Sequence, residues 1–220
     1  MDNAYLIPAG CGEAEYTDKK SRFIGQVSPA ASESEAMAFV ERIRRKHPDA
    51  AHNVWAYLLR DGAMRWSDDG EPGGTSGQPT LNVFRQAAVF DAVCVVTRYF
   101  GGILLGSGGL VRAYSRAASL ALEAAGTARM AEWALLRLEC GYPQYERVRR
   151  LLADFGAEET QAAFGGTVAV SALLPAEAAD EFSARLRDVT AGAVCCAETG
   201  RTFRPRRLPD GAAEKILPEK

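Results

Sequence analysis

The sequence predicts an α+β protein of two domains, and three observations lead to this prediction. The composition, 47% apolar and 25% charged residues, is ordinary for a globular protein and supplies enough apolar side chains for packed cores. In residues 1–132 the expected strands precede helices as in an α/β sandwich. In residues 133–200 the expected order is βαββαβ, the ferredoxin-like arrangement. We therefore expect a domain boundary near residue 132.

The first domain begins with two strand segments in residues 15–27, separated by the basic sequence KKSR. A helix is expected over residues 32–48, because Ser32 and Glu35 have the spacing of a capping box. Apolar residues recur through this segment at helical spacing, which predicts one buried stripe. The stripe consists of Met37, Phe39, Val40 and Ile43.

The middle of the first domain contains two further strands and two helices. Strands are expected over residues 51–59 and within 88–100, where the run AVCVV is apolar on both faces, as in a covered sheet. Helices are expected over residues 78–87 and 106–126, and the final glycine of the second one is placed to end it. The core-facing residues of the second helix are expected to be Leu110, Tyr114, Ala117, Ala118 and Ala121.

The second domain follows a simpler pattern of strands and helices. Pro143 is placed in the first turn of a helix, and Gly165 with Gly166 signals a hairpin between two strands. The expected elements are a strand at 133–140, a helix at 143–155, strands at 157–163 and 166–174, a helix at 175–189 and a strand at 191–199. Residues 201–220 are rich in charge, proline and glycine, and we expect them to form a tail.

Composition also bounds the function. The longest apolar runs are too short to cross a bilayer, so we expect no membrane partner. The first residues lack the basic start and apolar stretch of a signal peptide, which predicts a cytoplasmic protein. The five cysteines include one adjacent pair and no CxxC spacing, so neither a disulfide framework nor a zinc ribbon is expected. With a net charge of -2, any nucleic-acid binding must come from a local basic patch.

The glycine-rich segment at residues 101–109 leads from a buried strand into a helix. Free N–H groups at a helix start bind anions, helped by the helix dipole. Arg98 precedes the segment, and Arg112 and Arg116 lie four apart on the exposed face of the helix, where a phosphate would relieve their mutual repulsion. The alternative interpretation is tight packing with solvated arginines. The expected phosphate-binding residues are Gly101, Gly102, Gly106, Ser107, Gly108 and Gly109.

The segment RWSDDGEPGGTSGQP, residues 65–79, is longer than most connections in compact domains. We expect an ordered functional loop rather than a simple turn. Its end runs into the helix expected at 78–87, which offers a second helix start for anions. The phosphate-binding residues expected there are Gly74, Thr75 and Gly77.

The acidic side chains of the same segment suggest a catalytic alternative. Asp68, Asp69 and Glu71 are oxygen ligands of the kind that hard cations prefer. With His52 upstream they would form the polar site of a metal-assisted hydrolase. The competing interpretation is that the acids cap turns and pair with arginines, and that the histidine bonds to backbone. We expect no resident metal or cofactor.

Three segments together resemble a known family. AHNVWAY (51–57), SDDGEPGGTSGQP (67–79) and RYFGGILLGSGGLVRAY (98–114) are similar to the IMPACT family, in particular to its bacterial members of the YigZ type. The resemblance covers residues 15–130, and the βαββαβ segment is similar to the extra domain of bacterial members. One departure is Ser76, where the family pattern has alanine.

The resemblance implies a fold and a class of function. The amino-terminal domain is expected to be like the second domain of a small-subunit ribosomal protein, a fold shared with domain IV of elongation factor G. The carboxy-terminal domain is expected to be like domain V of that factor. Eukaryotic relatives regulate translation by competing for the activator of a starvation-sensing kinase. Those relatives carry a different extra domain, so the same partner is not implied here.

The first hypothesis is therefore a translation-linked regulatory protein that binds RNA or the ribosome. Its basic contacts would be Lys19, Lys20, Arg22, Arg98, Arg112 and Arg116, with the two glycine-rich segments holding phosphates. Such binding weakens steeply with salt. The alternatives are a metal-assisted enzyme acting on a phosphorylated small molecule, and a protein–protein scaffold. A translation-regulatory protein is a further candidate partner.

Overall fold

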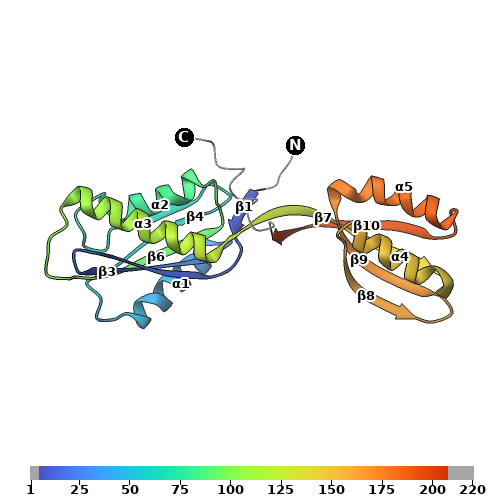
Figure 1. Ribbon diagram of the computed structural model, residues 1–220, viewed down its shortest axis with the longest axis horizontal. Coiled ribbons are helices and arrows are strands. Elements are labelled where there is room, and N and C mark those ends of the chain that lie inside the picture. The colour runs from blue at the N-terminus through green and yellow to red at the C-terminus, as the bar shows by residue number, and fades with distance from the viewer. Residues whose placement is uncertain (1–4, 208–220) are drawn as a thin grey trace. The chain divides into compact units, whose positions relative to one another are not determined.

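The computed structural model describes residues 5–207 and divides them into two compact units (Figure 1). The first unit contains Tyr5–Arg129 and residues 205–207, and the second contains Met130–Arg204. Both units combine helices with a β-sheet, so the α+β prediction is confirmed. Within residues 5–207, no helix is long and apolar enough to cross a membrane.

The first unit is built on a five-stranded sheet with the order β2-β3-β6-β4-β5. All neighbouring strands in it are antiparallel. The strands are β2 (Gly12–Asp18), β3 (Ser21–Pro29), β4 (His52–Leu58), β5 (Met64–Ser67) and β6 (Ala92–Tyr99). The central strand β6 is buried along almost its whole length, as its apolar sequence predicts.

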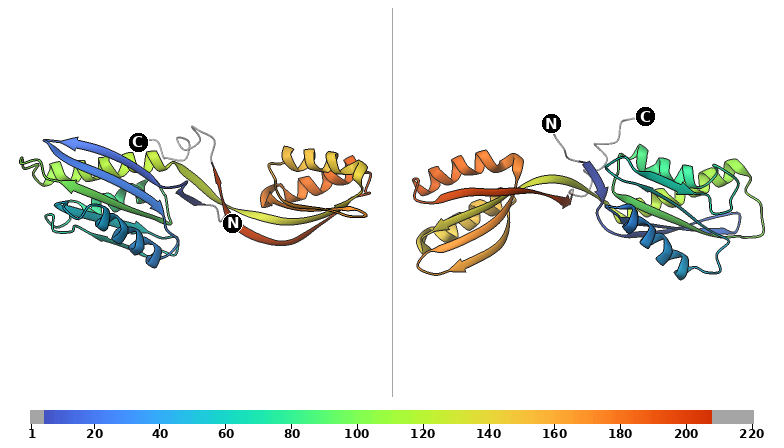
Figure 2. Two further views of the ribbon diagram at one scale, coloured as in Figure 1. Left: turned by 90° about the horizontal axis from the view of Figure 1, so that it is seen from below. Right: turned by 180° about the vertical axis from the view of Figure 1, so that it is seen from behind.

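Helices cover both faces of this sheet (Figure 2). One face packs against α1 (Glu33–Lys46) through a separate apolar cluster. The other face packs against α2 (Gly77–Gln86) and α3 (Ser107–Ala125). All three helices lie where the sequence predicts them, because each carries an apolar stripe at helical spacing.

The start of α1 shows how local chemistry sets an element boundary. The Ser32 hydroxyl accepts a hydrogen bond from the Glu35 N–H at 3.2 Å, which is the first half of the predicted capping box. The Glu35 carboxylate accepts from the Ala31 N–H at 2.8 Å instead of from the Ser32 N–H. Both bonds satisfy N–H groups at the start of the helix and the residues just before it, which have no partner inside the helix.

Close packing of α3 against the sheet positions one side chain of the site. Its face of small residues lets the helix backbone approach β3 directly at Gly25, where an added methyl group would overlap the Ala117 carbonyl. Tyr114, on the same face, therefore lies close to the sheet, and the centroid of its ring is 5.2 Å from that of Phe23. The buried hydroxyl of Tyr114 then needs a partner inside the unit.

The second unit has the βαββαβ order expected from its sequence. Its strands pair in the order β10-β7-β9-β8. The strand β1 (Tyr5–Pro8) belongs to the first unit and pairs with β7, whose first residues, 127–129, also belong to the first unit. One apolar cluster joins this sheet to both helices. The elements are β7 (Thr127–Cys140), α4 (Tyr142–Asp154), β8 (Glu158–Phe164), β9 (Val168–Pro175), a short 3-10 helix (Ala176–Ala178), α5 (Ala179–Thr190) and β10 (Cys195–Arg207).

Two expectations about element boundaries are wrong. The predicted loop at 65–79 begins inside β5, and the predicted tail at 201–220 begins inside β10. The strand β10 can contain charged residues because their side chains are exposed and paired. Arg201, for example, forms an ion pair with Glu132 at 3.0 Å. The rest of the predicted tail, 208–220, lies outside the described residues.

Candidate functional site

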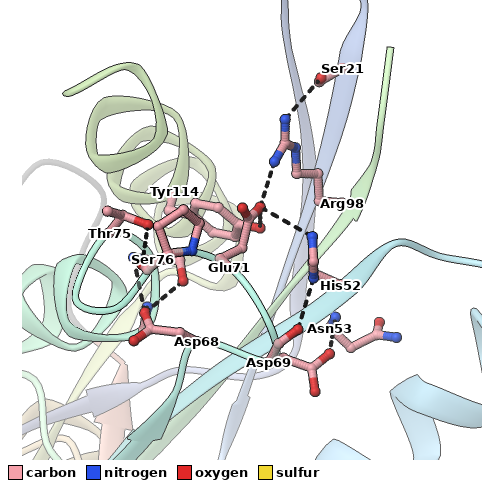
Figure 3. A network of polar contacts seen from close by, with 12 residues as sticks. Ser21, His52, Asn53, Asp68, Asp69, Glu71, Thr75, Ser76, Arg98 and Tyr114 are labelled. Atoms are coloured by element: carbon pink, nitrogen blue, oxygen red, sulfur yellow. Dashed lines mark hydrogen bonds and ion pairs between the residues drawn. The ribbon is translucent and has the colours of Figure 1, made fainter. Parts of the chain in front are cut away.

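A buried carboxylate, Glu71, joins the two glycine-rich segments (Figure 3). Its Oε1 atom accepts hydrogen bonds from Arg98 Nη1 at 2.6 Å and from the Tyr114 hydroxyl at 2.7 Å. The side chains of Glu71 and Arg98 are only 3% and 7% exposed. Because Arg98 precedes the glycine-rich turn at 101–109 and Tyr114 follows it, the two segments meet at this carboxylate.

Further hydrogen bonds hold this charge pair in place. Arg98 Nη2 lies 3.4 Å from Ser21 Oγ, which also accepts from the Gly101 N–H at 3.2 Å. Burial raises the pKa of the Tyr114 hydroxyl far above its usual value, and the hydrogen bond to Glu71 raises it further. Tyr114 therefore stays protonated and acts as a donor. The arrangement neutralises a charge that would be costly to bury alone.

The start of α2 is occupied by a carboxylate of the chain itself. Asp68 Oδ1 accepts from the N–H groups of Ser76 and Gly77 at 3.1 and 2.8 Å, and from the Ser76 hydroxyl at 2.7 Å. Asp68 Oδ2 accepts from the Gly74 N–H at 2.8 Å. The donors that would bind an external anion are therefore already used.

In the structure, the groups of Gly74, Thr75 and Gly77 that were expected to bind phosphate have partners within the same loop. The first and third donate their N–H groups to Asp68, and the hydroxyl of the second donates to the Pro72 carbonyl at 2.6 Å. The helix start does attract negative charge, as its dipole predicts. The chain supplies that charge from within the same loop.

The cap made by Asp68 leads to a first prediction. Burial raises the pKa of this carboxyl, but the hydrogen bonds from Gly74, Gly77 and Ser76 outweigh it and lower the pKa below its usual value. A group with a lowered folded-state pKa stabilises the fold above its unfolded pKa, and this contribution is lost as the pH falls through the folded value. We expect Asp68→Ala to reduce the free energy of unfolding by about 1–2 kcal/mol at neutral pH.

Urea unfolding at a series of pH values measures this effect. The difference between Asp68→Ala and the unmodified chain should shrink as the pH falls below the usual range of aspartate. Asp154→Ala is the matched control, because Asp154 is exposed at the end of α4. An identical pH dependence in both variants would contradict the capping role.

The acidic residues proposed as metal ligands each bind other groups of the chain and do not converge on one site. Asp69 accepts from the Asn53 N–H at 2.7 Å and from Arg44 Nη2 at 3.1 Å. Its carbonyl oxygen bonds to His52 Nδ1 at 2.8 Å, and His52 Nε2 lies 3.8 Å from Glu71 Oε1. In the described part of the chain, no group of three or more His, Cys, Asp or Glu side chains is arranged to hold a metal. These contacts match the interpretation in which the acids cap turns and pair with arginines.

The glycine-rich turn at 101–109 differs from the start of α2. Gly101 packs against the backbone of the β2–β3 turn, where an added methyl group would overlap the Lys20 carbonyl. Its role is thus close packing. The first residues of α3 have no side-chain cap. The exposed residues at this start are Gly102, Gly106, Ser107 and Gly108, whereas Gly109 is buried.

The predicted basic residues fall into two groups. Lys19 and Lys20 form the exposed turn between β2 and β3, with positive φ angles of 44° and 65°. Within residues 5–207, neither lysine has an acidic partner, and the same holds for Arg112. The β2–β3 turn and the start of α3 lie at the same end of the first unit (Figures 1 and 2).

The other predicted cations are neutralised within the chain. Arg22 forms a two-point ion pair with Glu15, at 3.0 and 2.8 Å. Arg116 lies 3.8 Å from Glu123. Arg98, expected as a surface contact for RNA, is buried and paired with Glu71. Its sequence position at a strand end did not reveal that Glu71 would cover it.

Comparison with known proteins identifies the family. The Impact N-terminal domain matches residues 19–122, and a domain of unknown function (DUF1949) matches residues 138–193. The chain is 37% identical over 195 residues to the IMPACT family member YigZ of Escherichia coli (strain K12), which covers 87% of this chain and 96% of that protein. The chain belongs to the IMPACT family.

Two further comparisons agree with membership of the IMPACT family. An IMPACT family member of Haemophilus influenzae is 33% identical over 192 residues, covering 86% of this chain and 93% of that protein. A solved structure described as the crystal structure of a hypothetical protein has a TM-score of 0.58 and 35% identity, and covers 91% of this chain and 98% of that chain. These similarities extend through both units.

The segments that carry the IMPACT resemblance meet around one side chain. His52 lies in the first segment, Glu71 in the second, and Arg98 and Tyr114 in the third, and the last three are joined by hydrogen bonds. The network therefore fixes the relative positions of the three segments. We interpret the network as a structural support for the site rather than as a ligand-binding group, because its charged side chains are buried and paired with each other.

Sequence reasoning missed the apolar part of the third IMPACT-like segment, residues 98–114. Phe100, Ile103 and Leu104 are exposed in the structure, although they follow a buried strand. Tyr114 was expected only as a core residue, and its bond to Glu71 was not foreseen. One feature of the sequence could have indicated this exposure. The large apolar residues lie between glycines, and no amphipathic pattern there assigns them to a core.

Proposed function

We propose that this IMPACT family chain binds RNA, free or within the ribosome, and acts in the regulation of translation. One observation carries the proposal. At one end of the first unit, Lys19, Lys20 and Arg112 have no acidic partner within residues 5–207. The uncapped start of α3 lies at the same end.

The physical argument rests on unused positive charge. A basic side chain with an acidic neighbour gains little from a phosphate, whereas an uncompensated one releases counterions when it binds a polyanion. The α3 start adds N–H donors and the positive end of a helix dipole. The proposed contact residues are thus Lys19, Lys20, Gly106, Ser107, Gly108 and Arg112.

The link to translation comes from the family resemblance. Eukaryotic relatives regulate translation, and both units are expected to resemble domains of elongation factor G. A chain with such a fold and a phosphate-binding end would contact ribosomal RNA or structured RNA in the same process. The alternative of a metal-assisted enzyme has no ligand cluster in residues 5–207 to support it.

The proposal predicts a salt-dependent loss of RNA affinity when the lysines are replaced. We expect Lys19→Asn with Lys20→Asn to weaken binding of a structured RNA hairpin about tenfold at low salt, because two phosphate contacts are removed. The plot of log affinity against log salt should become shallower by roughly 1.5. Asparagine suits this turn, because it tolerates positive φ.

Fluorescence anisotropy with a labelled RNA hairpin measures both quantities. The matched control removes the same charge at Arg60 and Arg85, which lie near the start of β6 rather than at its end. We expect Arg60→Gln with Arg85→Gln to bind like the unmodified chain. No RNA binding by the unmodified chain at low salt, or equal losses in both double variants, would refute the proposed function.

A further inference from the structure

We infer that this surface prefers unpaired RNA, whose bases stack on an exposed apolar loop formed by Phe100, Ile103 and Leu104. The inference rests on the proposed RNA-binding function and names the form of RNA that the surface selects. The loop begins directly after β6 and ends before α3.

The apolar loop exposes large side chains together. Phe100, Ile103 and Leu104 are 51%, 43% and 82% exposed, and Val111 on the next helix is also exposed. Single exposed apolar residues are common, but several in one short segment mark a binding surface. Leu105, directly afterwards, is buried in the core and anchors the segment.

The ring of Phe100 rests on a fixed support. The Arg98 Cζ atom lies 5.5 Å from the centroid of the Phe100 ring and 5.4 Å from that of Phe23. Arg98 itself is held by Glu71 at 2.6 Å. The guanidinium group is therefore held within the unit in contact with the Phe100 ring, while about half of that side chain remains open to solvent.

Such a ring is suited to stacking. Every nucleobase has a flat π face, and stacking on an aromatic side chain stabilises binding without demanding a particular sequence. A ring held by its neighbours loses little conformational freedom when a base arrives. Ile103 and Leu104 extend the apolar surface beside it. The buried network at Glu71 thus positions the stacking residue.

The positive charge beside the apolar loop favours RNA over a protein as the partner. Gly101 of the turn packs on the backbone of Lys20, so the loop and the lysines are neighbours. Lys19 and Lys20 have no acidic partner in the described part of the chain. Single-stranded nucleic acid offers bases and phosphates next to each other, matching an apolar platform with basic neighbours. Duplex RNA keeps its bases stacked inside the helix and offers only backbone and groove edges.

Anisotropy with two probes tests the inference. One probe is a short single-stranded oligouridylate, and the other is a blunt RNA duplex of the same strand length. We expect Phe100→Ala with Leu104→Ala to weaken binding of the single strand about tenfold while changing duplex binding less than about twofold. Phe100→Tyr should keep the affinity of the unmodified chain, because the aromatic face is retained.

The matched control is Phe164→Ala in the second unit. Phe164 is 61% exposed, and its ring contacts Tyr142 and Tyr145 rather than the proposed surface. We expect this variant to bind both probes normally. Circular dichroism and thermal unfolding show whether each variant is folded at the temperature of the binding measurement.

The outcomes separate this inference from the proposed function. Equal affinity of the unmodified chain for both probes, or equal losses on both probes in Phe100→Ala with Leu104→Ala, would overturn the preference for unpaired RNA. The proposed function would still stand if Lys19→Asn with Lys20→Asn weakened both probes. If Phe100→Ala with Leu104→Ala left binding of the single strand unchanged, base stacking on the apolar loop would be rejected as well. The loop would then be a candidate contact for a protein partner. Absence of binding to either probe would overturn both proposals.

Discussion

Replacing Glu71 with alanine is expected to lower the free energy of unfolding of the first unit by about 3–5 kcal/mol, the range seen when one partner of a buried ion pair is removed. Arg98 would keep its charge inside the unit after losing the carboxylate that it contacts at 2.6 Å. The Tyr114 hydroxyl would lose its acceptor as well. An unpaired buried charge and an unsatisfied buried donor both destabilise the folded state.

A double-mutant cycle separates the ion pair from its surroundings. We expect Glu71→Leu and Arg98→Met each to be destabilising alone, and the two together to recover much of the loss, because an apolar pair can replace a buried ion pair. The two units need not unfold together. Hydrogen exchange of peptides from β6 therefore reports on the first unit, and peptides from α4 in the second unit serve as the internal reference.

A small effect would contradict this view of the network. If Glu71→Ala lowered the stability of β6 by less than about 1 kcal/mol, the interaction would resemble an exposed ion pair. Arg98 would then have to reach solvent or another acceptor in solution. The network could no longer be regarded as the support that fixes Phe100.

Much of the fold could be predicted because its signals are local. The apolar stripe of α3 and the two-sided apolar run of β6 each specify an element from neighbouring residues alone. The short edge strand β5 was missed because its side chains are mostly exposed, so its sequence has no alternation of buried and exposed positions. The extension of β10 was missed for a similar reason, since its charges are paired with residues far away in the sequence, such as Arg201 with Glu132.

The site was harder to predict because it depends on the path of loops. Sequence alone indicated that the start of α2 would attract an anion, but not that Asp68 would occupy it from eight or nine residues upstream. The same reasoning applied to α3, where no side chain caps the start. Two similar glycine-rich patterns therefore have different surroundings, and only the three-dimensional course of the chain distinguishes them.

Arg98 and the apolar loop depart from the usual burial preferences of their residue types in opposite directions. Arginine is usually exposed, so Arg98 was expected at the surface, although Glu71 makes its burial tolerable. Leu104 belongs to a type that is usually buried, yet it is exposed. Both departures from the usual preference occur within residues 98–114, the third of the segments that resemble the IMPACT family.

Adding a methyl group at Gly101 is expected to disturb both stability and RNA binding. The Cβ atom of Gly101→Ala would overlap the carbonyl group of Lys20 and the nitrogen of Ser21. These are backbone atoms, so a side-chain rotation cannot relieve the overlap. The glycine-rich turn and the β2–β3 turn must separate, which also breaks the bond from the Gly101 N–H to Ser21 Oγ. We expect a loss of about 2–3 kcal/mol in the free energy of unfolding.

The same substitution tests whether the two halves of the surface act together, because it removes neither positive charge nor apolar area. Gly73→Ala is the matched control, since its Cβ would meet no heavy atom within 4 Å and its φ angle is not positive. We expect that control to change stability by less than about 0.5 kcal/mol and to bind RNA normally. At a temperature where it is folded, Gly101→Ala should bind the single-stranded probe more weakly, because phosphates and bases can no longer reach the lysines and Phe100 in one pose. Full single-strand affinity in a folded Gly101→Ala variant would show that the two turns bind independently.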